Sequence, residues 1–131
     1  MIGLDTNIIV RYLAQDDPVQ SARATRIFER QLTEDEPGFV SLVAIVETAW
    51  VLDRVYGLSG RAIANAIERM LQADTLMIQN EQEVFTAMMA LKTGAATFSD
   101  ALIGALGGWA GCASTLTFDR KAARSKDFEL A

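Results

Sequence analysis

Short apolar segments, each followed by a segment with helical periodicity, constrain the fold of this chain more than any other feature of its sequence. Apolar runs at residues 2–5, 39–41, 75–79 and 112–118 have the length of buried strands and are too short for buried helices. A further segment at 128–130 is predicted as an edge strand. Strands that alternate with helices favour a parallel sheet covered by helices on both faces. We therefore predict an α/β fold with one short parallel sheet of about four to five strands.

Turn and capping residues divide the rest of the chain into helices. Pro18 stands at the first position of a helix that Asp17 precedes, and Gly57 ends a long apolar helix. Ser59 and Ser99 are the predicted N-caps of two further helices. The predicted helices span residues 7–14, 18 to about 32, 42–56, 61–71, 81–93 and 99–110, with a short helix at 120–125.

Length and composition are those of one folded domain. The chain has 131 residues, of which 50% are hydrophobic and 22% are charged, so we expect a single domain over residues 1–131. The sequence shows no signal-peptide pattern and no uninterrupted apolar run of about 18 residues. We therefore expect a cytoplasmic protein that has no membrane partner.

The chain contains no histidine, which excludes several classes of active site. Serine and cysteine nucleophiles activated by histidine are ruled out, as are zinc sites built on imidazole. Oxygen ligands are plentiful, so a bound metal would be a hard cation. The net charge of −5 speaks against a nucleic-acid partner, but four acids that bind cations would change it from −5 to −1. The charge therefore does not exclude RNA.

Four acidic residues stand where local structure alone explains them only in part. Asp5 and Asp119 each follow a predicted strand, and Asp100 lies in the first turn of an apolar helix. Glu47 is the one charged residue between Ser41 and Asp53, a run that is apolar nearly all round and therefore predicts a buried helix. Each aspartate has an alternative role as a helix cap or as a partner of the helix dipole. Glu47 has two alternatives, an arginine partner or a place at an exposed edge of its helix.

Considered together, these four acids are predicted to converge. Asp5 and Asp119 would share the carboxyl edge of one parallel sheet, where α/β proteins bind ligands. Glu47 can lean over that edge, and the helix that Asp100 opens leads into the strand before Asp119. Two carboxylates 4 Å apart repel by about 4 kcal/mol at an effective dielectric constant of 20. A divalent cation converts that repulsion into binding, and an oxygen-only pocket suits Mg²⁺ or Mn²⁺.

Four segments carry a resemblance to a known family. They resemble, in order and spacing, the acidic motifs of PIN-domain ribonucleases, and more narrowly the VapC-type toxins of bacterial toxin–antitoxin pairs. The segments are LDTNIIVRYL, VSLVAIVETAWVL, FSDALIGAL and LTFDRKAA. The resemblance implies a parallel sheet flanked by helices and RNA cleavage that depends on Mg²⁺ or Mn²⁺. It also implies a homodimer and inhibition by a small cognate antitoxin protein.

The resemblance also assigns roles to residues. Asp5, Asp100 and Asp119 would be metal ligands, and Glu47 would be a ligand or would hold a metal-bound water. Supporting polar roles beside the acids fall to Thr6, Asn7 and Thr117. The chain departs from many relatives at Thr97, which stands where they carry a further aspartate. That departure puts a second metal site in doubt.

The predicted reaction is metal-assisted hydrolysis of RNA phosphodiester bonds, leaving a 5′-phosphate and a 3′-hydroxyl. Arg11 lies about one to two helical turns after Asp5, and Arg120 and Lys121 follow the last acid directly, so these three are candidates for phosphate contacts. They are equally explained as ordinary surface residues. One rival interpretation is a phosphatase or phospho-acceptor domain with Asp5 as nucleophile. Another is a PIN-like module that binds RNA or protein without catalysis.

Overall fold

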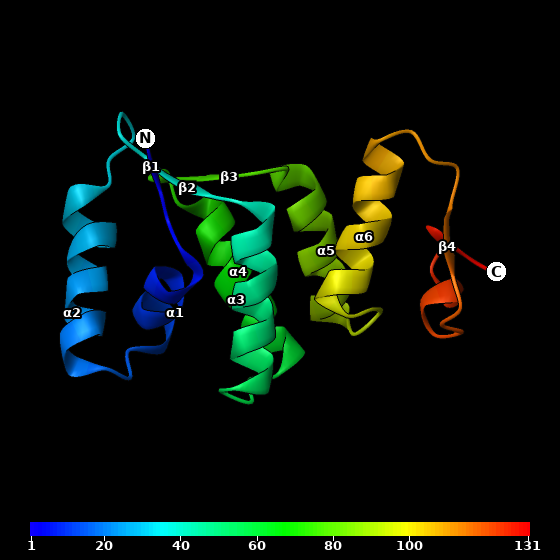
Figure 1. Ribbon diagram of the computed structural model, residues 1–131, viewed down its shortest axis with the longest axis horizontal. Helices are drawn as coiled ribbons and strands as arrows, with labels where there is room; N and C mark the ends of the chain where they lie inside the picture. Colours follow the sequence, from blue (N-terminus) through cyan, green and yellow to red (C-terminus); the bar gives the residue numbers. More distant parts are fainter.

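Helices and strands lie close to their predicted positions in a computed structural model that describes residues 1–131 (Figure 1). The strands are β1 (Ile2–Gly3), β2 (Gly38–Val40), β3 (Leu76–Ile78), β4 (Thr115–Thr117) and β5 (Phe128–Leu130). The helices are α1 (Thr6–Ala14), α2 (Pro18–Arg26), α3 (Leu42–Arg54), α4 (Gly60–Gln72), α5 (Glu81–Thr93) and α6 (Phe98–Trp109). A π-helical turn (Ile27–Gln31) extends α2, and a 3₁₀ turn (Ala122–Arg124) precedes β5. None of the helices has the length and apolar character needed to cross a membrane.

Side chains before the helices explain where the helices begin. The Asp17 carboxylate accepts hydrogen bonds from two backbone N–H groups at the start of α2, at 3.0 and 2.8 Å. The hydroxyl of Ser59 caps α4 as predicted. The predicted cap of α6 at Ser99 is wrong, because Thr97 Oγ1 accepts the N–H of Asp100 at 3.2 Å. The helix consequently begins at Phe98, one residue before its predicted start.

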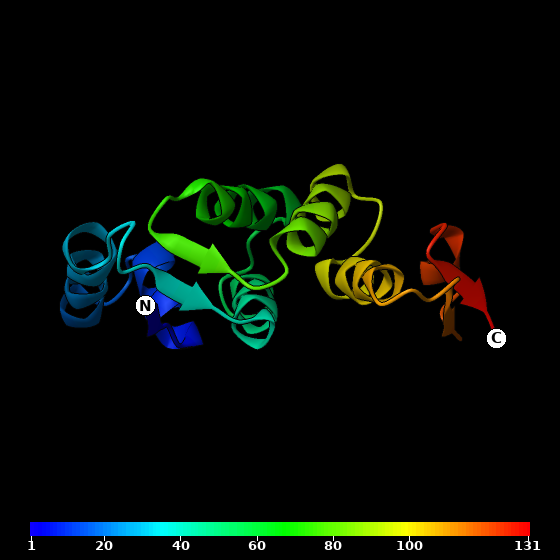
Figure 2. The same cartoon turned by 90° about the horizontal axis from the view of Figure 1, so that it is seen from above.

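The five strands are all paired in parallel, and they are divided between two sheets. The first sheet has the order β1-β2-β3, with Gly38 opposite both Ile2 and Leu76. The second contains only β4 and β5, with Thr115 opposite Phe128. Figure 2 shows α4 on one side of the three-stranded sheet and α1 and α3 on the other. The α/β class is confirmed, whereas the predicted joining of β4 to the first three strands is not observed.

One apolar core holds the N-terminal part of the chain together. It lies among the three-stranded sheet, helices α1, α3, α4 and α5 and the π-helical turn, and α6 contributes the buried side chains of Phe98 and Leu102. After Leu102, only the half-buried Leu106 packs against this core. Its largest fully buried side chains are Ile9, Ile45, Leu52, Ile67 and Met88.

The C-terminal unit, which we define as β4, the 3₁₀ turn and β5 (residues 115–130), lies beyond α6 at one end of the molecule (Figures 1 and 2). It packs on α6 where that helix has glycines. A Cβ at Gly104 would lie 2.8 Å from the Phe128 ring, and one at Gly107 would lie 2.8 Å from Thr115 Oγ1. The unit thus packs closely against α6 but lies outside the main core.

Candidate active site

Two of the four predicted acids line one pocket, at the carboxyl end of β1. Asp5 caps α1, where its carboxylate accepts the N–H of Thr6 at 2.8 Å. The buried Thr6 hydroxyl donates to Glu47 Oε2 at 3.2 Å, so one residue joins the two carboxylates. The pocket has a volume of about 350 Å³ and is lined by Asp5, Thr6, Asn7, Val10, Arg11, Glu47, Val51, Val55 and Tyr56. Asn7, predicted to support Asp5, therefore also faces this pocket.

Glu47 lies on an exposed face of α3. The prediction that α3 is buried nearly all round is wrong, because Val43 and Trp50 on this face are 67% and 57% exposed. No arginine pairs with Glu47, whose side chain instead accepts from Thr6. Of the two alternatives that the sequence left open, the exposed helix edge is the one observed. Its carboxylate is consequently available to a ligand in the pocket.

Arg11 faces the pocket but is held by three neighbours. Its Nε donates to Gln20 Oε1 at 2.8 Å, and its Nη1 donates to Asp16 Oδ1 at 3.3 Å and to the Tyr56 hydroxyl at 3.1 Å. The Tyr56 hydroxyl in turn donates to Asp16 Oδ2 at 2.6 Å. That hydrogen bond is the largest cause that holds the pKa of Asp16 below its usual value, ahead of a backbone hydrogen bond and the nearby Arg11 charge. The same hydrogen bond raises the pKa of Tyr56. The guanidinium is thereby fixed beside the pocket.

Sequence reasoning missed Tyr56 as a residue of this site. The signal that points to it is helical spacing, because Glu47 and Val51 on α3 and Val55 at its C-cap recur every four residues and all line the pocket. Tyr56 is the residue directly after Val55. Asp16 was also missed, and the sequence gives no comparable signal for it, since it meets Tyr56 across 40 residues of chain.

Asp119 lies after β4 in the other sheet and makes only local contacts. Its Oδ1 accepts the N–H of Lys121 at 2.8 Å and that of Ala122 at 3.4 Å, so it caps the turn that follows. Thr117, its predicted neighbour, accepts the Asp119 N–H on Oγ1 at 3.0 Å. Arg120 and Lys121 are exposed and take part in no ion pair. This end of β4 thus presents one carboxylate and two free cationic side chains.

Asp100 lies in the first turn of α6 and is half-buried. Its backbone N–H donates to Thr97 Oγ1 at 3.2 Å. Thr97 therefore has a structural role here as the N-cap of α6. Asp100 does not line the pocket that holds Asp5 and Glu47.

The predicted convergence of four carboxylates is not observed within one copy of the chain. Nowhere do three or more acidic, cysteine or histidine side chains gather closely enough to hold a metal ion. The physical reason is that β4 does not pair with β1, so Asp119 stays with the second sheet. Asp5 and Glu47 remain as a pair at the end of β1. Such a pair fits Mg²⁺, which proteins commonly hold by one or two carboxylates together with waters and substrate phosphates.

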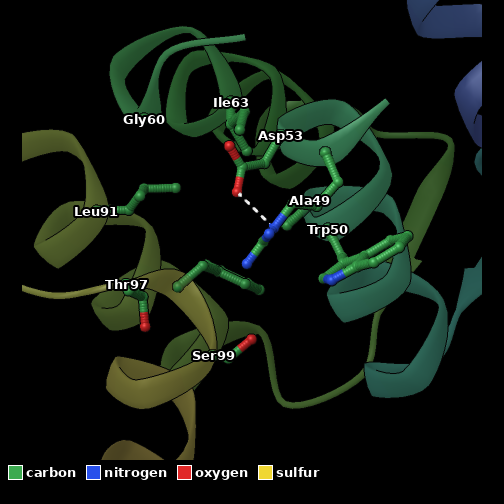
Figure 3. A pocket seen from close by; sticks show the side chains of 10 residues that line it. Ala49, Trp50, Asp53, Gly60, Ile63, Leu91, Thr97 and Ser99 are labelled. Carbon is green, nitrogen blue, oxygen red and sulfur yellow. Dashed lines mark ion pairs between the residues drawn. The ribbon is translucent and has the colours of Figure 1, made fainter. Parts of the chain in front are cut away.

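A second pocket, of about 390 Å³, lies between α3, α4, α5 and the start of α6 (Figure 3). Half of its lining is hydrophobic, and its rim carries Trp50 from α3 with Thr97 and Ser99 from α6. Its ion pair, Arg54 Nε to Asp53 Oδ2 at 3.7 Å, is largely exposed and therefore weak. None of the four predicted acids lines this pocket, so we place the candidate active site at the end of β1.

Comparison with known proteins gives one match. A family model described as "PIN domain" matches residues 2–127, which is nearly the whole chain. No curated protein and no solved structure matches it.

Proposed function

Because the chain belongs to the PIN domain family, we propose that it is an endoribonuclease that hydrolyses RNA phosphodiester bonds with the help of Mg²⁺ or Mn²⁺. PIN domains are typically nucleases that use divalent metal ions. The observation that carries the proposal is the pocket at the end of β1, where Asp5 and Glu47 face one space beside Arg11. Carboxylate pairs of this kind are what hard cations bind, and a guanidinium is suited to phosphate.

The residues of the pocket have distinct proposed tasks. Asp5 and Glu47 supply carboxylate oxygens toward the cation, and Thr6 orients Glu47 through its hydroxyl. Arg11, kept in place by Asp16 and Tyr56, offers positive charge at the side of the pocket for an RNA phosphate. A bound Mg²⁺ or Mn²⁺ would polarise the scissile phosphate, and Asp5 and Glu47 are the acids of this pocket that would hold it.

We further propose that the chain is the toxin of a toxin–antitoxin pair, neutralised by a small VapB-like antitoxin. The support for this is the resemblance of the four acidic segments to VapC-type toxins, together with the family match. Expression of the wild-type chain should then arrest growth, and expression of the Asp5→Asn variant should not. Equal growth with both proteins would contradict the toxin role. The nuclease activity would then be tested separately, by RNA cleavage with the purified protein.

The direct test is cleavage of a mixed pool of folded cellular RNAs by the purified protein. We expect discrete fragments with Mg²⁺ or Mn²⁺, none with EDTA, and none with Asp5→Asn. The matched control is Asp53→Asn. Asp53 is an exposed aspartate on α3 that lies outside the pocket at β1, so this variant should cleave like the wild type. Equal results with wild type and Asp5→Asn would contradict the proposal and favour a non-catalytic binding module. Products ending in a cyclic phosphate would contradict the hydrolytic mechanism.

A further inference from the structure

The second pocket lies across helix α3 from the candidate active site. Glu47 and Val51 of α3 line the pocket at β1, whereas Ala49 and Trp50 of the same helix line the second pocket. The volume of the second pocket, about 390 Å³, is within the range of pockets that hold small organic ligands. The two pockets are therefore close enough together to contact one extended ligand.

The lining of this pocket combines apolar side chains with hydroxyl groups. Ile63 and Leu91 are among its apolar residues, and Thr97 and Ser99 supply hydroxyls on the α6 side (Figure 3). Thr97 Oγ1 accepts the N–H of Asp100, which leaves its hydroxyl proton free to donate to another group. Such a lining suits a planar ligand that has apolar faces and polar edges, and a nucleobase has both.

Trp50 is the exposed aromatic side chain of this pocket. It is 57% exposed, and its ring lies on the α3 side, across from Thr97 and Ser99 (Figure 3). The one stacked aromatic pair in the protein joins Tyr12 and Phe28, so no ring of the chain stacks on Trp50. Proteins that bind single-stranded nucleic acids stack bases on exposed aromatic rings of this kind.

Glu47, Trp50 and Arg54 follow one another at helical spacing on the outward face of α3. Residues three apart on a helix have Cβ atoms about 5–6 Å apart, so the Trp50 ring adjoins Glu47. Arg54 Nε lies 3.7 Å from Asp53 Oδ2, beyond hydrogen-bond distance, and 69% of the Arg54 side chain is exposed. Its guanidinium is therefore available to an RNA phosphate. Along α3 the order is carboxylate, aromatic ring and cation.

We propose that the second pocket is a subsite for one base of the RNA, the base of a nucleotide beside the bond that is cleaved. The base stacks on Trp50, and the hydroxyls of Thr97 and Ser99 contact its polar edge. Arg54 contacts a phosphate of the same strand. The place of this base beside a cleaved bond rests on the proposed function, but its binding requires neither metal nor cleavage. Asp53 takes no part in these contacts, because its largely exposed carboxylate faces Arg54 (Figure 3).

A base is favoured over an apolar side chain of a partner protein as the occupant of this pocket. An apolar side chain would remove water from the hydroxyls of Thr97 and Ser99 without replacing its hydrogen bonds, which costs free energy. A base carries donors and acceptors along its edge and leaves those hydroxyls paired. The position of the pocket beside Glu47, with the cationic Arg54 on the same face, favours a base that belongs to an RNA strand.

The fluorescence of Trp50 tests the subsite without cleavage. Trp109→Phe leaves Trp50 as the only tryptophan of the chain, and EDTA prevents cleavage by removing divalent cations. The probes are single-stranded RNA tetranucleotides of A, C, G or U, an abasic tetranucleotide with the same phosphates, and the nucleoside 5′-monophosphates. We expect saturable quenching by at least one tetranucleotide that carries bases, and binding of the abasic probe that is about fivefold weaker or more.

Three results of this titration would overturn the proposal. Equal quenching by the abasic probe would show that the protein binds phosphates only. No quenching by any tetranucleotide would show that no base stacks on Trp50. Nucleoside monophosphates that bind as tightly as the tetranucleotides would assign the pocket to free nucleotides and not to RNA.

Substitution of Trp50 gives a second readout, the anisotropy of a labelled tetranucleotide in EDTA. Trp50→Ala should weaken binding about 5- to 150-fold, the range for one stack of a base on an aromatic ring, and Trp50→Phe should restore part of it. The matched control is Trp109→Ala, which removes the other exposed tryptophan, at 68% exposure, and should bind like the wild type. Unchanged binding by Trp50→Ala, or equal loss in the control, would overturn the proposal.

Failure of the subsite and failure of the proposed function give different results. Cleavage of RNA with Mg²⁺, without binding that depends on bases and on Trp50, would contradict the subsite alone. Binding that depends on bases and on Trp50, without cleavage when Mg²⁺ is added, would contradict the nuclease and leave a base-binding pocket.

Discussion

At the scale of single residues, the hydrogen bond from Thr6 to Glu47 holds the candidate site together. Thr6 is buried, and its hydroxyl is the one protein group that donates to the Glu47 carboxylate. Thr6→Val removes the donor at nearly constant volume, whereas Thr6→Ser keeps it. A hydrogen bond to a charged group contributes about 1.5–3 kcal/mol, so we expect RNA cleavage to fall about tenfold or more in Thr6→Val and to recover in Thr6→Ser. Equal loss in both variants would mean that Thr6 acts by packing alone.

The second prediction at this scale concerns the titration of Tyr56. Its hydrogen bond to Asp16 favours the protonated phenol and the ionised carboxylate, so the pKa of Tyr56 is raised and that of Asp16 is lowered. Asp16→Asn should bring the pKa of Tyr56 down toward its usual value, as measured by phenolate absorbance. Glu29→Gln is the control, because burial and then Glu29 raise the pKa of the other tyrosine, Tyr12. If Asp16→Asn leaves both tyrosines unchanged, the Tyr56–Asp16 contact is absent in solution.

The lowered pKa of Asp16 also makes the free energy of unfolding depend on pH. The folded state holds this carboxylate ionised more strongly than the unfolded state does. Its contribution is therefore present above the pKa of the unfolded state and is lost as the pH falls through the lower pKa of the folded state. Both partners lie near the surface, so the effect on the free energy of unfolding is expected to be small.

At the scale of elements, most of the structure could be predicted from local sequence. Strand and helix positions follow from short apolar runs and from caps such as Asp17 and Ser59, which act within three residues of chain. The cap of α6 was misplaced because Thr97 and Ser99 both precede an apolar run, and sequence alone gives no reason to prefer the threonine. The exposed face of α3 could not be predicted, since its apolar side chains are those of a buried helix.

The packing of the C-terminal unit against α6 gives a prediction at this scale. Gly104→Ala would place a methyl group 2.8 Å from the Phe128 ring and 3.0 Å from Asp127 Cβ, so the unit must shift. Amide hydrogen exchange across residues 115–130 should become faster. Gly108→Ala, in the same helix with no atom near the new methyl group, should leave that exchange unchanged and gain about 0.5–1 kcal/mol of helix stability. Equal exchange in both variants would show that the unit does not depend on this contact.

At the scale of the whole molecule, the division of the strands between two sheets lay beyond sequence reasoning. Each strand has only two or three residues. Its apolar pattern predicts a buried parallel strand but does not indicate which strand lies beside it. The grouping of Asp5 with Glu47 could be predicted, because Asp5 follows β1, Glu47 lies on the helix after β2, and these two strands pair with each other. The separation of Asp119 from this pair could not be predicted, because the sequence does not show that β4 pairs only with β5.

The most direct test of a nuclease site at the end of β1 compares the wild type with Glu47→Gln in the cleavage of folded cellular RNA with Mg²⁺. Glutamine keeps a side-chain oxygen that can accept the Thr6 hydroxyl, so the variant should fold. We predict that Glu47→Gln loses RNA cleavage, whereas Asp53→Asn, on the same helix but outside this pocket, cleaves like the wild type. Equal cleavage by the wild type and Glu47→Gln would contradict a nuclease site built on Asp5 and Glu47.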